Sequence, residues 1–170
     1  MKKILAILLA AAMIIALTGC VGGASYEVKN ATSDEEAAEI KADNYTKDYD
    51  GLISYLLDKG YIYNYMYSTA DDSKEELTSE VYYDIIGANN GIRYYFTDKK
   101  TFVEIYDFSG EQNETAKKVI EDVKDDGKFR AIDAGDELTG VLSKSGKYMI
   151  IYNASNKYEY DKITDELENW

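Results

Sequence analysis

The sequence predicts an α+β domain with two layers, in which a mostly antiparallel sheet of four to five strands carries helices mainly on one face. Short polar turns join pairs of segments that are rich in β-branched and aromatic residues, which is the pattern of β-hairpins. Segments with apolar residues at helical spacing lie between these hairpins. The range 44–170 has the usual length of one domain with one core.

The first half of this domain is predicted to contain helix, strand and helix. A helix over residues 47–59 ends at Gly60, which supplies a C-terminal stop. Residues 61–67 place tyrosine at every second position and favour a strand, although an extended helix also fits. Residues 73–86 begin with a capping serine and carry glutamate in the first turn, which predicts a second helix. Its apolar residues at helical spacing are Leu77, Val81 and Ile85.

A hairpin and a third helix are predicted next. Residues 92–97 and 101–108 are strand-like and flank the turn at 98–100. The helix covers residues 113–125, and Gly127 lies just past its end.

The C-terminal part predicts a second hairpin and a last helix. Residues 138–143 and 147–153 form the strands, and 144–146 form the turn. The last helix covers about 157–169, with Ile163 and Leu167 four residues apart on one face. Because consecutive strands are joined as hairpins, the sheet is expected to be mostly antiparallel.

The N-terminus has the arrangement of a secretory signal peptide. Lys2 and Lys3 precede fourteen uninterrupted apolar residues, 4–17. A helix of that length reaches about 21 Å, whereas the hydrocarbon core of a bilayer is about 30 Å thick. A signal peptide is therefore favoured over a transmembrane span.

The tetrapeptide Leu17-Thr18-Gly19-Cys20 resembles the lipobox of bacterial lipoproteins. The resemblance implies a diacylglyceryl group on the Cys20 thiol, cleavage before Cys20 and acylation of the palmitate type. Two acyl chains give stable membrane attachment, whereas one gives only marginal binding. The expected location is therefore the extracytoplasmic face of the cell membrane, in the cell envelope. The alternative is that Cys20 is the last residue of an ordinary signal peptide or a small buried thiol.

Three divisions of the chain follow. Residues 1–19 are the predicted lipoprotein signal peptide, 20–43 the lipidated cysteine with an acidic tether, and 44–170 the single α+β domain. The tether is small, polar and acidic, with few large apolar side chains to bury. Ser33 and Glu36 have the spacing of a capping box, which predicts a short helix through residues 36–40.

Composition limits the possible functions. The formal net charge is -13, which disfavours binding to nucleic acid. The chain contains no histidine and one cysteine, Cys20, so the common general base and the common metal ligands are missing from the domain. We therefore expect no catalytic residues, no metal site and no cofactor.

The sequence offers weak support for a calcium site and for an enzyme that uses paired carboxylates. Residues 46–51 have the rhythm of an EF-hand loop, but the loop begins with Thr46 and has Leu57 where glutamate is required. Other carboxylate clusters fit solvated loops and helix starts better than calcium sites. Glu104 and Asp107 are three residues apart on a strand, so their side chains are expected on opposite faces.

The predicted binding surface is an aromatic sheet face, suggested by 17 tyrosines. One face of the sheet would be aliphatic, and the other would present aromatic rings around Glu104, suited to a glycan or a peptide. The candidate residues are Tyr63, Tyr65, Glu104, Tyr106 and Tyr152. The alternative is that the tyrosines only pack within the sheet or beneath helices.

Four further segments show a resemblance over roughly residues 48–168. Residues 86–95, residues 103–108, an Ala/Lys helix after them and the strand at 146–152 resemble small lipoproteins of clostridial-type bacteria, a group with no activity to transfer. The resemblance implies the anchor, one domain and a Gram-positive host.

The first hypothesis for function is a membrane-anchored, non-enzymatic, extracytoplasmic binding or interaction domain. Its partner would be an envelope protein, a peptide or a glycan, in addition to the membrane itself through the lipid on Cys20. The alternative is a structural or regulatory accessory lipoprotein of an envelope protein complex.

Overall fold

A computed structural model describes residues 31–67, 74–95, 101–131, 135–152 and 157–170. Cys20, the predicted signal peptide and the first part of the predicted tether lie outside the described residues. No helix in the described ranges combines the length and the hydropathy needed to cross a bilayer.

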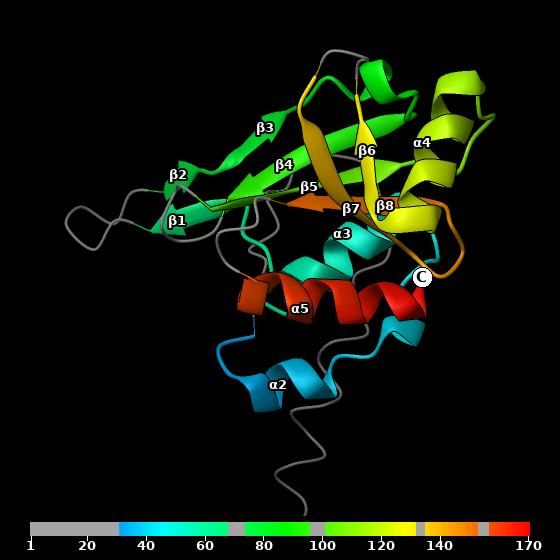
Figure 1. The fold of residues 1–170 in the computed structure, drawn as a ribbon. Helices are drawn as coiled ribbons and strands as arrows, with labels where there is room; N and C mark the ends of the chain where they lie inside the picture. Colours follow the sequence, from blue (N-terminus) through cyan, green and yellow to red (C-terminus); the bar gives the residue numbers. More distant parts are fainter. Residues whose placement is uncertain (1–30, 68–73, 96–100, 132–134, 153–156) are drawn as a thin grey trace, which may run out of the picture.

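The centre of the fold is an antiparallel sheet of six strands in the order β3-β4-β5-β8-β7-β6 (Figure 1). Its strands are β3 (Thr78–Glu80), β4 (Asn90–Tyr95), β5 (Phe102–Asp107), β6 (Lys128–Arg130), β7 (Glu137–Leu142) and β8 (Tyr148–Tyr152). Strands β1 (Tyr65–Tyr67) and β2 (Lys74–Glu76) form a separate antiparallel pair. The predicted α+β class is confirmed, with one strand more than the upper number expected.

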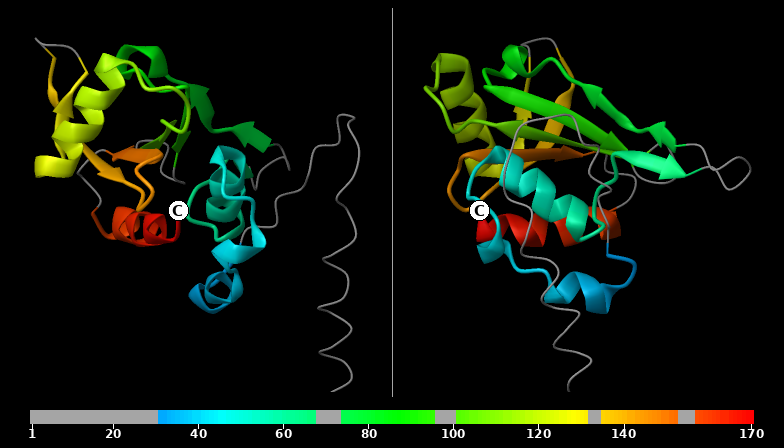
Figure 2. Two further views of the ribbon diagram at one scale, coloured as in Figure 1. Left: turned by 90° about the vertical axis from the view of Figure 1, so that its right-hand side faces the viewer. Right: turned by 180° about the vertical axis from the view of Figure 1, so that it is seen from behind.

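Helices lie mainly on one face of the sheet, and one helix covers part of the other. The α-helices are α2 (Asp34–Glu39), α3 (Tyr49–Asp58), α4 (Glu114–Asp126) and α5 (Lys157–Glu166). The 3-10 helices are η2 (Ala42–Asn44), η3 (Tyr83–Ile86) and η5 (Leu167–Asn169). Figures 1 and 2 show α3 and α5 side by side beneath the sheet, with α2 beyond them and α4 on the opposite side.

Two hydrophobic clusters fill the two sides of the sheet. The first joins α3 and α5 to the sheet through residues such as Leu56, Ile105 and Ile163. The second places α4 against Tyr106, Met149 and other residues of the opposite face. Ile105 and Tyr106 are neighbours in β5 but belong to different clusters, because successive side chains of a strand point to opposite faces.

Helix α4 forms where the sequence predicts it. Asn113 caps its N-terminus by accepting a hydrogen bond from the backbone N–H of Ala116 at 2.8 Å. Gly127 ends it in the left-handed conformation, with φ of 75°. Four apolar residues at helical spacing face the sheet: Ala116, Val119, Ile120 and Val123.

Both predicted hairpins are confirmed. Strand β4 pairs with β5, and β7 pairs with β8. The last helix is also present, as α5 followed by η5. Strand β6 was not predicted, because three residues directly after a helix carry too little pattern to be recognised as a strand.

The helix predicted over residues 73–86 is wrong. This segment contains β2, β3 and η3 instead. Strand β3 pairs with β4 at the edge of the sheet, and this pairing prevails over a weak helical pattern. β-branched residues and consecutive tyrosines within the segment also lower its helix propensity. Leu77 is buried while Ile85 is exposed, so the apolar residues at helical spacing do not share one buried face.

The strand predicted over residues 61–67 is present only as β1, at its C-terminal end. Gly60, with φ of 67°, ends α3, and the N–H of Tyr61 donates to the carbonyl of Leu56 at 3.0 Å. Ile62 is then fully buried in the cluster beneath α3. The residues directly after Gly60 therefore end α3 and enter the core, and the strand begins only at Tyr65.

The described part of the predicted tether, residues 31–43, packs against the domain. Ala42 belongs to the core cluster of α3 and α5, and Asp34 forms an ion pair with Lys162 at 2.7 Å. The Ser33 hydroxyl accepts from the N–H of Glu36 at 3.2 Å, as a capping box requires. The Glu36 carboxylate, however, accepts from the N–H of Thr32 at 2.7 Å.

Candidate functional site

The strand register separates the residues predicted to form one aromatic face. Tyr106 pairs with Met149, so an aromatic and an aliphatic side chain share a face. Tyr152 pairs with Val103 and therefore lies on the opposite face from Tyr106. Its ring stacks on Tyr160 of α5, with 4.3 Å between ring centroids. The expected division into an aromatic and an aliphatic face is wrong, because both faces are mixed.

The two other predicted tyrosines lie in β1 or just before it. Tyr63 forms an isolated bridge with Tyr95, at the end of β4. Tyr65 lies in β1, outside the six-stranded sheet, and its side chain lies outside the described part of the structure. Among the predicted binding residues whose side chains the structure describes, Glu104 and Tyr106 are joined by a hydrogen bond.

Glu104 is at the centre of a polar network on the α4 side of the sheet. One carboxylate oxygen, Oε1, accepts from Arg93 Nε at 2.9 Å and also from Arg93 Nη2. The other, Oε2, accepts from the Tyr106 hydroxyl at 2.7 Å. Burial and the hydrogen bond to Glu104 raise the pKa of Tyr106 above its ordinary value, so its hydroxyl stays a donor.

This network has the chemistry of a structural ion pair. Both oxygens of Glu104 are occupied by donors from the same hairpin, and the Arg93 guanidinium lies 4.3 Å from the centroid of the Phe102 ring. Asp107 does not form a carboxylate pair with Glu104. The two residues are three positions apart in β5, so their side chains lie on opposite faces of the sheet.

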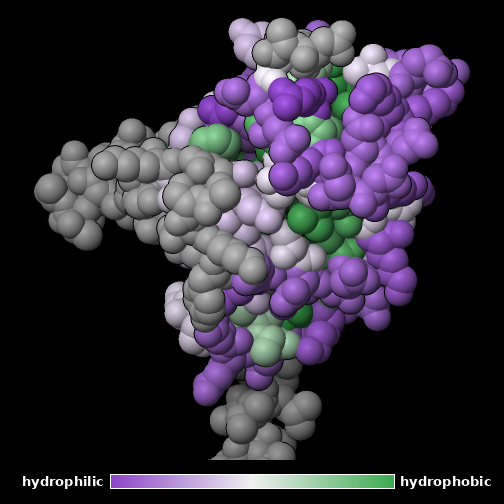
Figure 3. Space-filling view, viewed as in Figure 1, coloured by the Kyte–Doolittle hydropathy of each residue, from purple (hydrophilic) through white to green (hydrophobic). Residues whose placement is uncertain are grey.

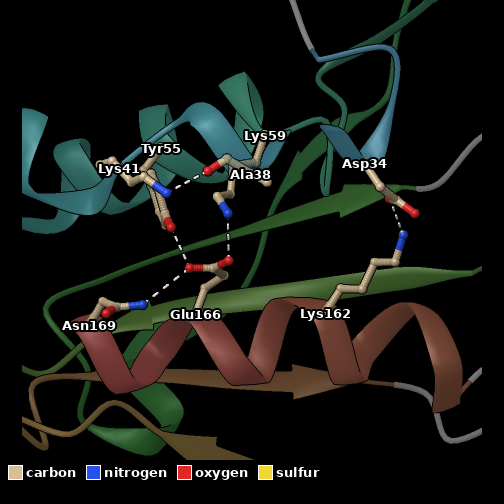
Figure 4. Close-up of polar contacts among 8 residues, drawn as sticks. All are labelled: Asp34, Ala38, Lys41, Tyr55, Lys59, Lys162, Glu166 and Asn169. Atoms are coloured by element: carbon tan, nitrogen blue, oxygen red, sulfur yellow. Dashed lines mark hydrogen bonds and ion pairs between the residues drawn. The ribbon is translucent and has the colours of Figure 1, made fainter. Parts of the chain in front are cut away.

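A second network of the same kind surrounds Glu166, on the opposite side of the sheet (Figure 4). Its Oε1 accepts from Lys59 Nζ at 2.6 Å, and its Oε2 accepts from the Tyr55 hydroxyl and from Asn169 Nδ2. The side chains of Lys59 and Glu166 are only 7% and 16% exposed. Burial and the contact with Glu166 raise the pKa of Tyr55 above its ordinary value.

The Glu166 network lines a hollow of about 340 Å³. The N-terminal segment forms one wall, and α3 with the C-terminal turn forms the other. Its lining residues are Ala38, Ile40, Lys41, Ala42, Asp43, Tyr55, Lys59, Glu166 and Asn169. Lys59 and Glu166 neutralise each other in this hollow and connect the end of α3 to α5.

Sequence reasoning missed the Glu166 network because its members are far apart in the chain. Lys59 and Glu166 are separated by 107 positions, whereas Arg93 and Glu104 are 11 positions apart on paired strands. The register of a hairpin can be predicted from its turn. A contact between helices that are far apart in the sequence has no comparable local pattern.

The stretch with an EF-hand rhythm is the start of α3. Asp48 Oδ1 accepts from the N–H of Gly51 and from the Thr46 hydroxyl, both at 2.8 Å. The backbone hydrogen bond from Gly51 lowers the pKa of Asp48. This carboxylate is therefore an N-cap. In the described ranges, no group of three or more potential ligand side chains is arranged around a metal position.

A larger hollow of about 880 Å³ runs between α4 and the edge strand β6. Charged side chains form its rims, while Val119 and Phe129 lie at its base and Ile85 at one end. The lining residues are Ile85, Glu114, Thr115, Lys118, Val119, Asp122, Asp125, Asp126, Lys128, Phe129, Arg130, Ala131 and Glu137. We call this hollow the α4–β6 groove.

An exposed apolar patch adjoins the groove. Tyr82 is 82% exposed and Ile85 is 45% exposed, and Tyr83 between them is also exposed. These residues lie in or beside η3, and Ile85 belongs to the groove lining. In Figure 3, hydrophobic surface appears between hydrophilic side chains on the side of the molecule that carries α4 and β6. This patch cannot be predicted from the sequence, because the apolar residues of this segment have the spacing of a helix that packs on a core.

Comparison with protein-family models, curated proteins and solved structures finds no match for this chain. Statements about its function therefore rest on its sequence and its geometry.

Proposed function

We propose that this chain is a lipid-anchored, extracytoplasmic lipoprotein whose domain binds a partner and performs no catalysis. The tetrapeptide that ends at Cys20, after a basic and then apolar N-terminus, supports the anchor. Two acyl chains on Cys20 would hold the domain at the membrane surface.

The α4–β6 groove with its exposed apolar end is the observation that carries the binding function. Exposed apolar side chains that adjoin a hollow are typical of interaction sites, since folding alone leaves little reason to gather them there. The volume of about 880 Å³ is within the range of ligand sites, about 300–1,000 Å³. An accessory role in an envelope complex uses the same surface, with a permanent protein partner in the groove.

The carboxylates of Glu104 and Glu166 also favour binding over catalysis. A general acid or base needs a carboxylate oxygen that can reach a substrate proton. The oxygens of Glu104 and Glu166 instead accept hydrogen bonds from neighbouring side chains.

Two measurements in bacterial cells test this proposal. First, labelling with palmitate should mark the full chain but not its Cys20→Ala variant, and that variant should leave the membrane fraction. Palmitate labelling of the variant would contradict the anchor.

Second, a photo-crosslinking amino acid should replace Ile85 in the groove, with Glu121 on the exposed side of α4 as the matched position. We expect crosslinked partner bands from position 85 and none of these bands from position 121. No crosslink from either position, or the same bands from both, would contradict a binding function for this groove.

A further inference from the structure

Strand β6 is an edge of the six-stranded sheet, so one side of its backbone is not used by the described strands. Its other side pairs with β7, with Phe129 opposite Leu138. The N–H of Gly140 donates to the carbonyl of Gly127 at 3.0 Å. Since hydrogen-bonded pairs alternate along an antiparallel ladder, Phe129 also directs its backbone groups to β7.

The same alternation turns the backbone of Lys128 and Arg130 away from β7. The hydrogen bond from the N–H of Lys128 to Asp126 Oδ1, at 2.9 Å, agrees with this direction. The N–H and the carbonyl of Arg130 point outward in the same way. Because Lys128, Phe129 and Arg130 all line the α4–β6 groove, this edge of β6 borders it.

Helix α4, which forms one wall of the groove, is as long as an extended chain of about six residues. Helix α4 has 13 residues and is therefore about 20 Å long. Six residues of extended chain cover about the same distance, at roughly 3.3 Å per residue. Ile85, which is 45% exposed, would contact an apolar side chain of such a segment, while Val119 and Phe129 are buried beneath it.

The charges of the groove favour a basic occupant. Five carboxylates line it, from Glu114, Asp122, Asp125, Asp126 and Glu137. The lining cations are Lys118, Lys128 and Arg130. Lys128 already pairs with Glu137 at 2.8 Å, and Lys118 pairs with Asp122 at 2.5 Å. Glu114 pairs with Lys117, outside the lining, at 2.7 Å, which leaves Asp125 and Asp126 in excess over Arg130. The whole chain is also negative, with a net charge of -13.

From these observations we infer that the α4–β6 groove takes an extended, basic segment of a partner protein, which pairs with β6 as an added strand. Backbone hydrogen bonds to the outward groups of Arg130 hold the segment, and alternate lysine or arginine side chains meet the carboxylates on α4. The inference rests on the proposed binding function and names the class of its partner.

The test uses the full chain in detergent micelles and a set of labelled hexapeptides. Lysine or arginine alternates with valine, isoleucine or tyrosine in one series, glutamate replaces the basic residues in a second, and proline replaces the apolar residues in a third. Fluorescence anisotropy should detect saturable binding of the first series alone, and this binding should weaken as salt is raised. Binding of the glutamate or proline series with equal affinity would overturn the inference, as would no binding of the basic series.

Arg130→Pro and Arg130→Ala make the decisive pair of variants. Both lose the guanidinium and its hydrogen bond to the Gly135 carbonyl, but only proline removes the outward N–H. Proline at an outward-facing position of an edge strand leaves the β6–β7 ladder intact. We expect Arg130→Pro to weaken peptide binding at least tenfold relative to Arg130→Ala, with unfolding midpoints of the two variants alike. Equal affinities of the two variants would overturn strand addition.

The outcomes separate this inference from the proposed function. Specific crosslinks from position 85, together with no binding of the basic peptides, would leave the binding function standing and remove the added strand. If crosslinks from position 85 joined two copies of this chain, a second copy would be the occupant of the groove. That result would also overturn the inference of a basic partner segment.

Discussion

Two hollows in the described part of the molecule contain similar residue types but use them in opposite ways. In the hollow beside α2, Lys59, Tyr55 and Asn169 all donate to the carboxylate of Glu166. In the α4–β6 groove, carboxylates line an open rim, and the backbone of β6 has an outward side. The first hollow is internally satisfied and stabilises the fold, whereas the second retains groups that a partner can use.

Burial explains the difference between the two. A buried charge must be paired within the protein, since no water is present to solvate it. An exposed carboxylate is solvated, so it can exchange water for a basic partner at little cost to the fold. Variants of the first hollow should therefore change stability, and variants of the second should change binding.

The largest expected effect is the loss of Glu166. Glu166→Ala leaves the Lys59 ammonium buried without its carboxylate, which typically costs about 3–5 kcal/mol of unfolding free energy. Urea denaturation of the full chain measures this loss. The double variant Lys59→Met, Glu166→Leu should recover most of the stability, because it removes both charges. A loss below about 1 kcal/mol for Glu166→Ala would contradict a buried stabilising pair.

A smaller loss is expected for the corresponding network on the other face. Glu104→Gln should cost about 1–2 kcal/mol, since the amide oxygen keeps one acceptor and the Arg93 side chain, 32% exposed, can be hydrated. The same urea measurement compares the two carboxylates directly. If Glu104→Gln cost as much as Glu166→Ala, the distinction between a local and a long-range ion pair would fail.

Alkaline titration tests the tyrosines of both networks. Burial raises the pKa of Tyr94 to about 12, and burial with a neighbouring carboxylate raises the pKa of Tyr55 and Tyr106 above the ordinary 10.0. These tyrosines bind protons more tightly in the folded state, so their contribution to stability is complete below pH 10 and falls as the pH rises above it. Tyrosine absorbance should show one group that titrates near pH 10 and another, with Tyr94, Tyr55 and Tyr106, that titrates at clearly higher pH. A single transition near pH 10 in a folded protein would be the contrary result.

The smallest effect on stability is expected in the groove. Asp125→Lys changes an exposed residue of α4 and should alter the unfolding free energy by less than about 0.5 kcal/mol. The affinity of Asp125→Lys for basic hexapeptides should fall several-fold. Glu121→Lys makes the same charge change outside the lining, and its affinity should stay closer to that of the unchanged chain. Equal losses for both variants would mean that net charge, and not the groove, attracts the peptides.

Local patterns predicted much of the fold. Asn113 and Gly127 mark the ends of α4 in the sequence, and both hairpins follow from their turns. The helix predicted at 73–86 failed because pairing of β3 with β4 lies outside any local window. The predicted aromatic face failed for a related reason, because the pairing of Tyr106 with Met149 depends on a register between strands 43 positions apart.

The candidate site could be predicted only in part. Glu104 and Tyr106 stand two residues apart in one strand, so their proximity is a property of strand geometry. The groove depends on how α4 packs beside β6, a strand of three residues, and on Ile85 remaining outside the core. No spacing within either segment carries that information.

The most direct test of the contrast between the two hollows is NMR of the isotope-labelled full chain in micelles, titrated with the tightest-binding basic hexapeptide. The account predicts shifts of backbone amides in β6 and along α4, centred on Phe129 and Arg130, with the amides of Lys59 and Glu166 unchanged. Shifts centred on Lys59 and Glu166, with β6 unchanged, would contradict it.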